Sequence, residues 1–425
     1  MKTICCALFF LAGCTRDNSE EYFRTLQSLL DRKDYFRLSA GLAASKDKIS
    51  AKRNIYYQAF VGNAFNQVSK SLGDIQALLT QYGSDLSDTE RIALLGLEEK
   101  NYFLAYDYAR AAQADREILD RYSHILDTNA VKEIQNELLV RNALTGTPPQ
   151  ELIQREMTTL HWTRDKIGLM EIPLRCHDSL YQGIFDTRAN ISSISKTFAS
   201  KLGLKMLDVS YEEGSGITGI RFKCGMGIAD SLYLGDILLR HVVFQVMPDE
   251  VLYLDRAQFS LDIILGFPII MQLKEIHIFQ DGRMTIPIIG TRNMAKNLAI
   301  DGLNPVILLK TETNDSLGFY FDSGSTGSDL YSIYFNKYQS KIIKAGKKEN
   351  VEYGGAGGAI NANVYSLDSV RFIVSDKMVT FRKISVLTRP INKRPDQYYG
   401  NIGQDLINQS KELILNFEDM YIELN

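Results

Sequence analysis

Two acidic segments in the C-terminal two thirds of the chain could perform acid–base chemistry together. The first is Asp186-Thr187-Arg188 and the second is Asp322-Ser323-Gly324, and each stands at the end of an apolar run. One carboxylate cannot both accept a proton from water and donate one to a carbonyl oxygen. Two neighbouring carboxyls do not ionise readily together, so they share one proton, and one serves as base while the other serves as acid. The pair is therefore suited to the attack of water on a carbonyl carbon.

The same order of motifs occurs in two segments of similar length, residues 151–290 and residues 291–425. After Asp186, the run Asp262-Ile-Ile-Leu-Gly266 leads into Phe267-Pro-Ile-Ile. After Asp322, the run Tyr399-Gly-Asn-Ile-Gly403 leads into Gln404-Asp-Leu-Ile. One such triplet alone would be a weak signal. Two copies with matching downstream runs indicate a duplicated unit.

In this order of motifs, residues 151–425 resemble the retropepsin-like and pepsin-like aspartic proteases, whose triplet is Asp-Thr/Ser-Gly with a later apolar-apolar-Gly. The resemblance implies that Asp186 and Asp322 are the catalytic residues of two β lobes in one chain. It also implies that Thr187 and Ser323 join the two loops through their hydroxyls, with Gly324 and Ser325 supporting the second loop. The expected substrate is an extended peptide or protein in the interlobe cleft, hydrolysed without a covalent intermediate or cofactor.

Arg188 departs from this family pattern, which has glycine at that position. Its backbone N–H can still point at the Asp186 carboxylate, but a non-glycine residue with positive φ would cost about 1 kcal/mol or more. The guanidinium either leaves the cleft or pairs with Asp186 and keeps it ionised, which would weaken catalysis. Two alternatives to an active protease therefore stay open. One is a catalytically degenerate peptide-binding protein, and the other is a helical scaffold with a purely structural β part.

The two triplets also differ at the next residue, which is Ala189 in the first and Ser325 in the second. We expect the Ser325 hydroxyl to donate to Asp322 and to favour its charged form. Asp186 would then hold the shared proton more often.

Glycine-rich turns follow both triplets at matching places, within residues 214–219 and 354–358. A phosphate-binding loop is excluded for the second, because no Lys-Ser/Thr pair and no helix follow it. The turns are either flaps that close over a substrate or ordinary hairpin loops. The flap candidates are Gly216, Gly219, Gly355 and Gly357.

The N-terminus has the pattern of an export signal. Lys2 precedes the apolar run Ile4–Leu11, and Leu11-Ala12-Gly13-Cys14 resembles the bacterial lipobox. This predicts a signal peptide at residues 1–14 and lipid attachment at Cys14, which would hold an exported protein on a bacterial membrane at its periplasmic or cell-surface face. A plain secretory peptide or a short buried helix is the alternative.

Residues 15–150 are predicted to form an all-α domain, because apolar residues recur at intervals of three and four. Ser87 and Glu90 have the types and spacing of a helix start. The domain is either tetratricopeptide-like or an irregular helical bundle, and we expect it to present a protein partner or to position the substrate. The prolines of Thr145–Gln150 mark its end. Short β-type runs follow, so the predicted fold is multidomain, an all-α domain and then an all-β two-lobed domain (151–290 and 291–425).

Composition excludes several classes of protein. The 48 Lys and Arg against 51 Asp and Glu give a net charge of −3, so nothing favours a nucleic-acid partner. The sequence contains no run of about 18 apolar residues, so a multi-span membrane protein is excluded. Scattered histidines and the lack of a Cys-x-x-Cys motif predict no zinc site, and we expect no metal. Cys176 and Cys224 remain after the signal segment, and the sequence leaves their disulfide bonding open.

Overall fold

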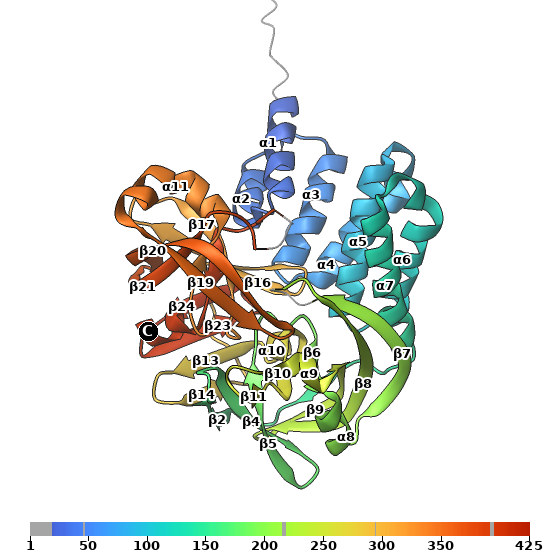
Figure 1. The fold of residues 1–425 in the computed structure, drawn as a ribbon. Coiled ribbons are helices and arrows are strands. Elements are labelled where there is room, and N and C mark those ends of the chain that lie inside the picture. Colours follow the sequence, from blue (N-terminus) through green and yellow to red (C-terminus); the bar gives the residue numbers. More distant parts are fainter. Residues whose placement is uncertain (1–18, 46, 215–217, 294, 392–394) are drawn as a thin grey trace, which may run out of the picture.

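The computed structural model describes residues 19–45, 47–214, 218–293, 295–391 and 395–425. The predicted signal segment, including Cys14, lies outside these residues. Figure 1 shows helices, in blue and teal, above and beside two β-rich parts, the first in green and yellow and the second in orange and red. The predicted order of an all-α part and a mostly β part is confirmed. In the part of the chain that the structure describes, no helix is long and apolar enough to cross a membrane.

The helical part is a series of helices in which each packs on the next along the chain. The structure supports a helical array, and a tetratricopeptide-like repeat stays a prediction. The helices are α1 (Ser19–Asp31), α2 (Tyr35–Ser45), α3 (Ala51–Ala64), α4 (Val68–Gln81), α5 (Asp88–Leu104), α6 (Tyr108–Tyr122) and α7 (Thr128–Leu144), with 3₁₀ turns η1 (Gly83–Asp85) and η2 (Ser123–Ile125).

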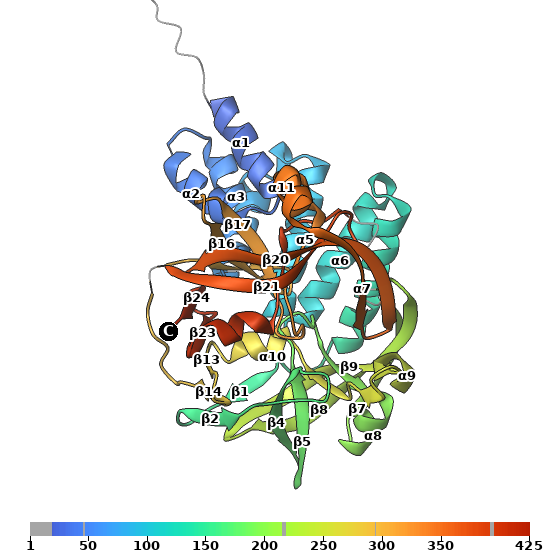
Figure 2. The same ribbon diagram turned by 60° about the vertical axis from the view of Figure 1, so that its left-hand side comes forward.

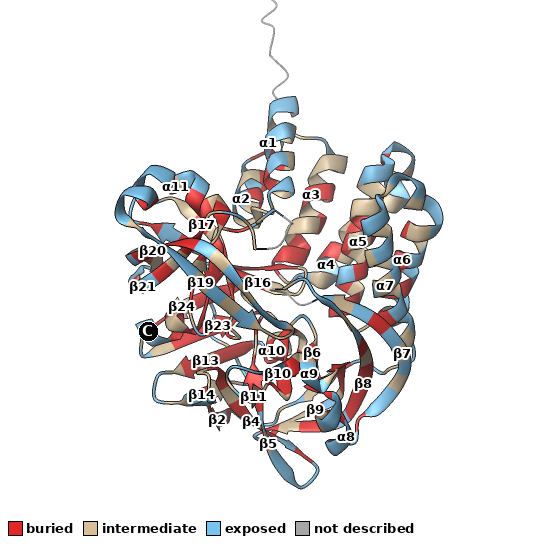
Figure 3. Cartoon of the chain, viewed as in Figure 1, coloured by how far each residue is buried: buried red, intermediate tan, exposed pale blue. Residues whose placement is uncertain are grey.

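Local sequence explains where these helices begin. Ser87 caps α5 by accepting the Glu90 backbone N–H at 3.2 Å, while the Glu90 carboxylate accepts the Ser87 N–H at 2.8 Å. The helix start predicted from the sequence is therefore confirmed, and the structure shows that it is a reciprocal capping box. Asp107 and Asp127 cap α6 and α7 with their side chains, which accept backbone N–H groups of the first turn. Figure 3 shows buried residues on the packed faces of these helices and exposed residues on their outer faces.

The first β half is built on a nine-stranded sheet in the order β1-β9-β6-β12-β5-β4-β8-β7, with β3 beside β4. Its strands are β1 (Glu151–Ile153), β3 (Thr163–Arg164), β4 (Met170–Cys176), β5 (Ser179–Phe185), β6 (Ser192–Ser195), β7 (Lys205–Gly214), β8 (Arg221–Leu234), β9 (Ile237–Met247) and β12 (Ile263–Leu265). Smaller elements are the hairpin β10 (Tyr253–Leu254) and β11 (Phe259–Ser260), and helices α8 (Lys196–Lys201), α9 (Asp249–Leu252) and α10 (Phe267–Gln272).

The second β half is built on an eight-stranded sheet in the order β15-β16-β17-β22-β18-β21-β20-β19. Figure 2 shows its long strands β20 and β21 arching over the centre of the molecule. The elements are β15 (Leu298–Asp301), β16 (Asn304–Thr311), β17 (Ser316–Phe321), β18 (Asp329–Leu330), α11 (Ser332–Ala345), β19 (Lys347–Gly355), β20 (Gly358–Val374), β21 (Lys377–Leu387), β22 (Gly400–Ile402) and η3 (Gln404–Gln409).

A third sheet joins the two halves. Its order is β2-β14-β13-β23-β24, and β13 pairs antiparallel with β23. The strands are β2 (Thr158–His161), β13 (Glu275–Phe279), β14 (Arg283–Ile286), β23 (Glu412–Asn416) and β24 (Tyr421–Leu424). The predicted boundary at 290/291 falls between β14 and β15, but the C-terminal strands return to the first half. The two β halves therefore share this sheet.

Cys176 and Cys224 are both buried and both free. The sequence left their bonding open, and the structure answers that these thiols do not form a disulfide with each other.

Candidate functional site

Equivalent strand pairings place the two aspartates. In the first half, β12 runs parallel to β5 and antiparallel to β6, and the Asp186 N–H donates to the Leu265 carbonyl at 3.1 Å. In the second half, β22 runs parallel to β17 and antiparallel to β18, and the Asp322 N–H donates to the Ile402 carbonyl at 2.8 Å. Each aspartate thus leaves its strand beside the downstream run that the sequence assigned to it.

The glycines that end those downstream runs have no room for a side chain. A Cβ on Gly266 would lie 2.6 Å from the Ala189 carbonyl oxygen, and a Cβ on Gly403 would lie 2.4 Å from the Gly327 carbonyl oxygen. Distances this short require backbone to move. The two glycines therefore let each downstream run pack directly against its aspartate loop.

Hydroxyl groups join the two aspartate loops to each other. The Thr187 hydroxyl donates to the Phe321 carbonyl at 2.8 Å and accepts the Ser323 N–H at 2.9 Å. The Ser323 hydroxyl donates to the Phe185 carbonyl at 2.7 Å and accepts the Thr187 N–H at 3.0 Å. Both side chains are fully buried. This reciprocal exchange is the one predicted for Thr187 and Ser323, and it fixes the two loops back to back.

Asp186 is a half-buried carboxyl group that accepts two backbone hydrogen bonds. The Arg188 and Ala189 N–H groups donate to its Oδ1 at 2.8 and 3.1 Å. Burial, followed by the negative charge of Asp322, raises the pKa of Asp186 to about 7, against the smaller lowering by these hydrogen bonds and by the Arg188 charge. Asp186 therefore keeps its proton up to near neutral pH.

Asp322 has a different set of partners. Its Oδ1 accepts the Gly324 N–H at 3.0 Å, and its Oδ2 accepts the side-chain amide of Asn401, also at 3.0 Å. The Arg188 guanidinium lies 3.8 Å from the same Oδ2. Both oxygens of Asp322 therefore accept a hydrogen bond, and Oδ2 also lies beside the positive charge of Arg188.

Gly324 brings the second loop against the first aspartate. A Cβ on Gly324 would lie 2.3 Å from the Asp186 carboxyl carbon, so only glycine fits there. The backbone two residues after Asp322 therefore contacts Asp186, while the side chain two residues after Asp186 contacts Asp322. Together with the influence of Asp322 on the pKa of Asp186, these contacts place both carboxyls in one small region.

The Arg188 side chain follows neither of the two paths considered from the sequence. It crosses to the second half, where its Nη1 donates to Asn401 at 3.1 Å and its Nε donates to Asn304 at 3.4 Å. The guanidinium also lies over the Tyr320 ring, 4.1 Å from the centroid. Its ion-pair partner is Asp322, so the alternative of pairing with Asp186 was wrong. Arg188 does not have a positive φ, so the backbone strain considered for this position does not arise.

The expected hydrogen bond from Ser325 to Asp322 was also wrong. The Ser325 hydroxyl donates to the Gly327 carbonyl at 2.8 Å instead, because the loop turns back at that point. Ser325 supports the loop through its backbone, where its carbonyl accepts the Gln404 N–H at 2.8 Å. The raised pKa of Asp186 still places the shared proton on that residue. The cause is burial and the negative charge of Asp322, and not a hydrogen bond from Ser325 to Asp322.

Both glycine-rich segments lie at the ends of long β-strands, and described residues of the two segments touch each other. The Thr218 hydroxyl, in the turn after β7, donates to the Gly357 carbonyl at 3.2 Å, and the Gly357 N–H donates to Val251 of the first half at 2.8 Å. Gly219 and Gly357 have positive φ, as tight turns require, and Gly355 ends β19. Gly216 lies outside the described residues. Whether these hairpins act as flaps stays a prediction.

One further contact links the second hairpin to the aspartate loops. The Tyr353 hydroxyl on β19 donates to Asp329 at 3.0 Å. Burial raises the pKa of Asp329 to about 6, and Asp322 contributes to that rise. This hairpin therefore reaches the strand that directly follows the second aspartate loop.

Asn401 is the main residue that sequence reasoning missed. It bridges Asp322 and Arg188, and it is buried at the position that Ile264 occupies in the first half. A signal was present, because the apolar-apolar-Gly pattern becomes Asn-Ile-Gly in the second half. A polar residue in a run that should be apolar indicates a specific partner.

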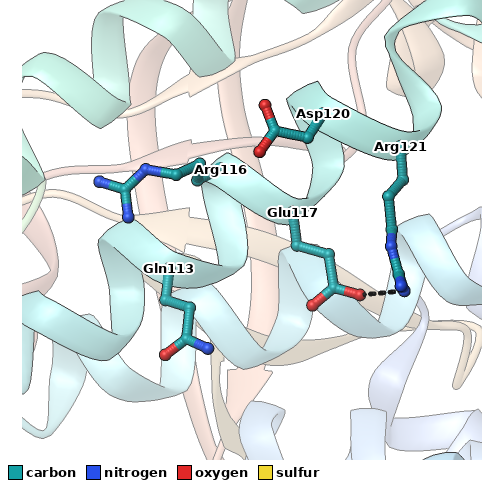
Figure 4. A pocket seen from close by; sticks show the side chains of 5 residues that line it. All are labelled: Gln113, Arg116, Glu117, Asp120 and Arg121. Atoms are coloured by element: carbon teal, nitrogen blue, oxygen red, sulfur yellow. Dashed lines mark hydrogen bonds and ion pairs between the residues drawn. The ribbon is translucent and has the colours of Figure 1, made fainter.

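A surface depression lies away from this site, on the outer face of α6. It is lined by Gln113, Arg116, Glu117, Asp120 and Arg121, all from the same helix. Figure 4 shows these side chains along the helix, with an ion pair between Arg121 and Glu117 at 2.8 Å. Exposed pairs at this helical spacing contribute little and are screened by salt. This depression is a solvated helix face, and it has no evident chemistry.

Neither a scan against protein-family models nor a search of the curated proteins matches this sequence.

Proposed function

We propose that this protein is an aspartic endopeptidase that hydrolyses peptide bonds with a water molecule activated between Asp186 and Asp322. The observation that carries the proposal is the joining of the two aspartate loops by the hydroxyls of Thr187 and Ser323. This exchange holds two acids that are far apart in the sequence in one region. It supports the resemblance to retropepsin-like and pepsin-like enzymes that the motifs indicate.

The contacts of the two carboxyls suggest separate roles. Asp186, which keeps its proton to about pH 7, donates that proton to the oxygen of the scissile carbonyl. Asp322, surrounded by donors and by Arg188, accepts a proton from the attacking water. The water oxygen then bonds to the carbonyl carbon, and Asp322 passes the proton that it took from water to the amide nitrogen. The C–N bond breaks as the carbonyl group re-forms, and Asp186 regains its proton from the hydroxyl group that it had protonated. No residue becomes covalently attached to the substrate.

We expect the substrate to be an extended peptide or a protein segment that binds beneath the two hairpins. Backbone groups of β7, β8, β19 and β20 could hydrogen-bond such a segment as an added strand. The contact between Thr218 and Gly357 would then have to open for entry and re-form over the bound peptide. The helical domain would present a protein partner or position the substrate.

The cellular place of this reaction is a proposal from the sequence alone. Cys14 and the preceding apolar segment suggest an exported lipoprotein held at a bacterial membrane by its lipid.

One observation favours a second candidate, a peptide-binding protein without catalysis. Arg188 replaces the family glycine and pairs with Asp322 at 3.8 Å. The family glycine has no side chain there, whereas this guanidinium lies beside the Asp322 oxygen that would have to accept a proton from water. The same loops could then hold a peptide without cutting it.

A mixed peptide library, analysed by mass spectrometry, separates the two candidates. The protease predicts new termini with the full-length protein and none with Asp186→Asn or with Asp322→Asn. Peptide capture that is equal in all three proteins, without new termini, would instead establish the binding protein. Cleavage that survives in either variant would rule out the two-aspartate mechanism.

A further inference from the structure

A group of three acidic side chains lies inside the helical domain, away from the aspartate loops. Glu99 from α5, Asp115 from α6 and Glu137 from α7 each offer one carboxylate oxygen, and these oxygens all lie within 4.8 Å of one another. Glu99 and Asp115 are buried, with 3% and 2% of their surfaces exposed, while Glu137 is exposed. We call this group the three-helix acidic cluster.

One positive charge balances only part of the cluster. The Arg141 Nε and Nη2 both lie 2.8 Å from Oε1 of Glu99, and the guanidinium covers the Phe103 ring at 4.3 Å. Charges of both signs are present near the exposed Glu137, namely Lys100 and Glu133. With these two included, four acidic groups against two basic ones leave an excess of negative charge in a largely buried place, which is unfavourable unless something compensates for it.

Asp115 supplies an independent sign that a ligand belongs there. Its Oδ2 is buried and has no hydrogen-bond partner in the part of the chain that the structure describes. A buried polar atom without a partner is rare, because it costs roughly 1–3 kcal/mol.

We propose that the three-helix acidic cluster binds a hard divalent cation, with Ca²⁺ as the best fit. Two oxygens that both lie within calcium-bonding distance of one ion cannot be more than about 5 Å apart, and the cluster meets this limit. Carboxylates are ligands for Ca²⁺ in one- or two-oxygen modes, with water completing the shell on the exposed side of Glu137. The cluster contains no histidine or cysteine, so it does not suit zinc or copper.

This site differs from what the sequence predicted. The expectation of no metal rested on the absence of zinc-type spacings, whereas these acids come from three different helices and have no common motif. An ion in the cluster would tie α5, α6 and α7 together. It would also stiffen the part of α7 that contacts β7, because Asn136, next to Glu137, bonds both backbone groups of Glu212.

Thermal unfolding and calorimetric titration of the full chain, after dialysis against EDTA, test the proposal. CaCl₂ is compared with NaCl at equal ionic strength. The matched control is Asp120→Asn, which removes an exposed acid on the outer face of α6.

We expect CaCl₂ to raise the unfolding temperature of the wild type and of Asp120→Asn saturably, with about one ion bound per chain, because a ligand of the folded state stabilises it by mass action. Asp115→Asn and Glu137→Gln should lose the response. Glu137 is exposed, so its variant is expected to fold even if Asp115→Asn does not. No saturable response in the wild type, or an unchanged response in Glu137→Gln and Asp115→Asn, would overturn the proposal.

Discussion

Arg188 is the residue that most distinguishes this site from the family pattern. Its backbone N–H donates to Asp186, and its side chain pairs with Asp322 and donates to Asn401. It therefore contacts both members of the proposed dyad from one position. Because its charge also lowers the pKa of Asp186, it is expected to set the pH range in which the dyad holds a single proton.

The first prediction concerns this pH range. For the wild type, kcat/KM should fall as the pH rises through about 7, because Asp186 then loses the proton that it donates. Arg188→Gly removes a charge that lowers the pKa of Asp186, so the fall should move to higher pH. Arg188→Lys keeps the charge and serves as the control. Peptide cleavage measured across pH checks this, and a fall that moves to lower pH in Arg188→Gly would contradict it.

At the residue scale, the sequence predicted the features that a short motif determines by itself. The triplets predicted Asp186, Asp322, Thr187 and Ser323, because a short motif at the end of a strand fixes its own loop. The direction of the Arg188 side chain could not be predicted, since its partners come from β16, β17 and β22 of the other half. The Ser325 hydroxyl was assigned wrongly for a similar reason, because the loop turn decides its acceptor.

At the scale of elements, the two aspartate loops depend on each other for their hydrogen bonds. Thr187→Val keeps the side-chain volume but leaves the Phe321 carbonyl and the Ser323 N–H without partners. We expect a loss of about 1–3 kcal/mol in the free energy of unfolding, with Ser323→Ala similar. The double variant should lose less than the sum of the two, because the side chains share one network.

Denaturant unfolding of the four proteins in this cycle provides the measurement. Thr326→Val, an exposed change in the same region, should alter stability by less than about 0.5 kcal/mol. Strict additivity of the Thr187 and Ser323 changes would show that the loops are not coupled.

Short β-type runs in the sequence located strands but not their lengths or partners. For example, the sequence contains the β-type run Val370-Arg-Phe-Ile-Val374, which in the structure is only the end of β20 (Gly358–Val374). The joining sheet could not be predicted at all, because β13 and β23 are brought together by the chain reversal of the whole second half. Pairing between strands so far apart in sequence leaves no local pattern to detect.

At the scale of the whole molecule, the helical domain contacts both β halves. Lys33, between α1 and α2, forms an ion pair with Asp301 of the second half at 2.8 Å. At the other end of the domain, Asn136 on α7 donates to the Glu212 carbonyl at 2.8 Å and accepts the Glu212 N–H at 3.0 Å. The helices therefore hold the edge of the hairpin that is proposed to cover the substrate.

Asn136→Ala tests this contact. The edge of β7 would lose two hydrogen bonds, and we expect a cost of about 1 kcal/mol with faster amide hydrogen exchange in β7. Gln135→Ala, an exposed change at the neighbouring position, should leave that exchange unchanged. Equal protection of β7 in Asn136→Ala and wild type would mean that α7 does not restrain the hairpin.

The proposed membrane anchor is tested by Cys14→Ala. Without the thiol no lipid can be attached, so the protein should move from the membrane fraction to the soluble fraction of the producing cells. Cys6→Ala changes a cysteine within the predicted signal and should leave the protein on the membrane. Unchanged fractionation of Cys14→Ala would exclude a lipid on this residue.

The most direct test of the two-aspartate mechanism is kcat/KM for Asp186→Asn, Asp322→Asn and the double variant, measured on one cleaved peptide below pH 7. If the two carboxyls act as one unit around a single water, each single change should lower the value by roughly 10³-fold or more, and the double variant should be no worse than either. Losses that multiply in the double variant, or substantial cleavage remaining in one single variant, would contradict that mechanism.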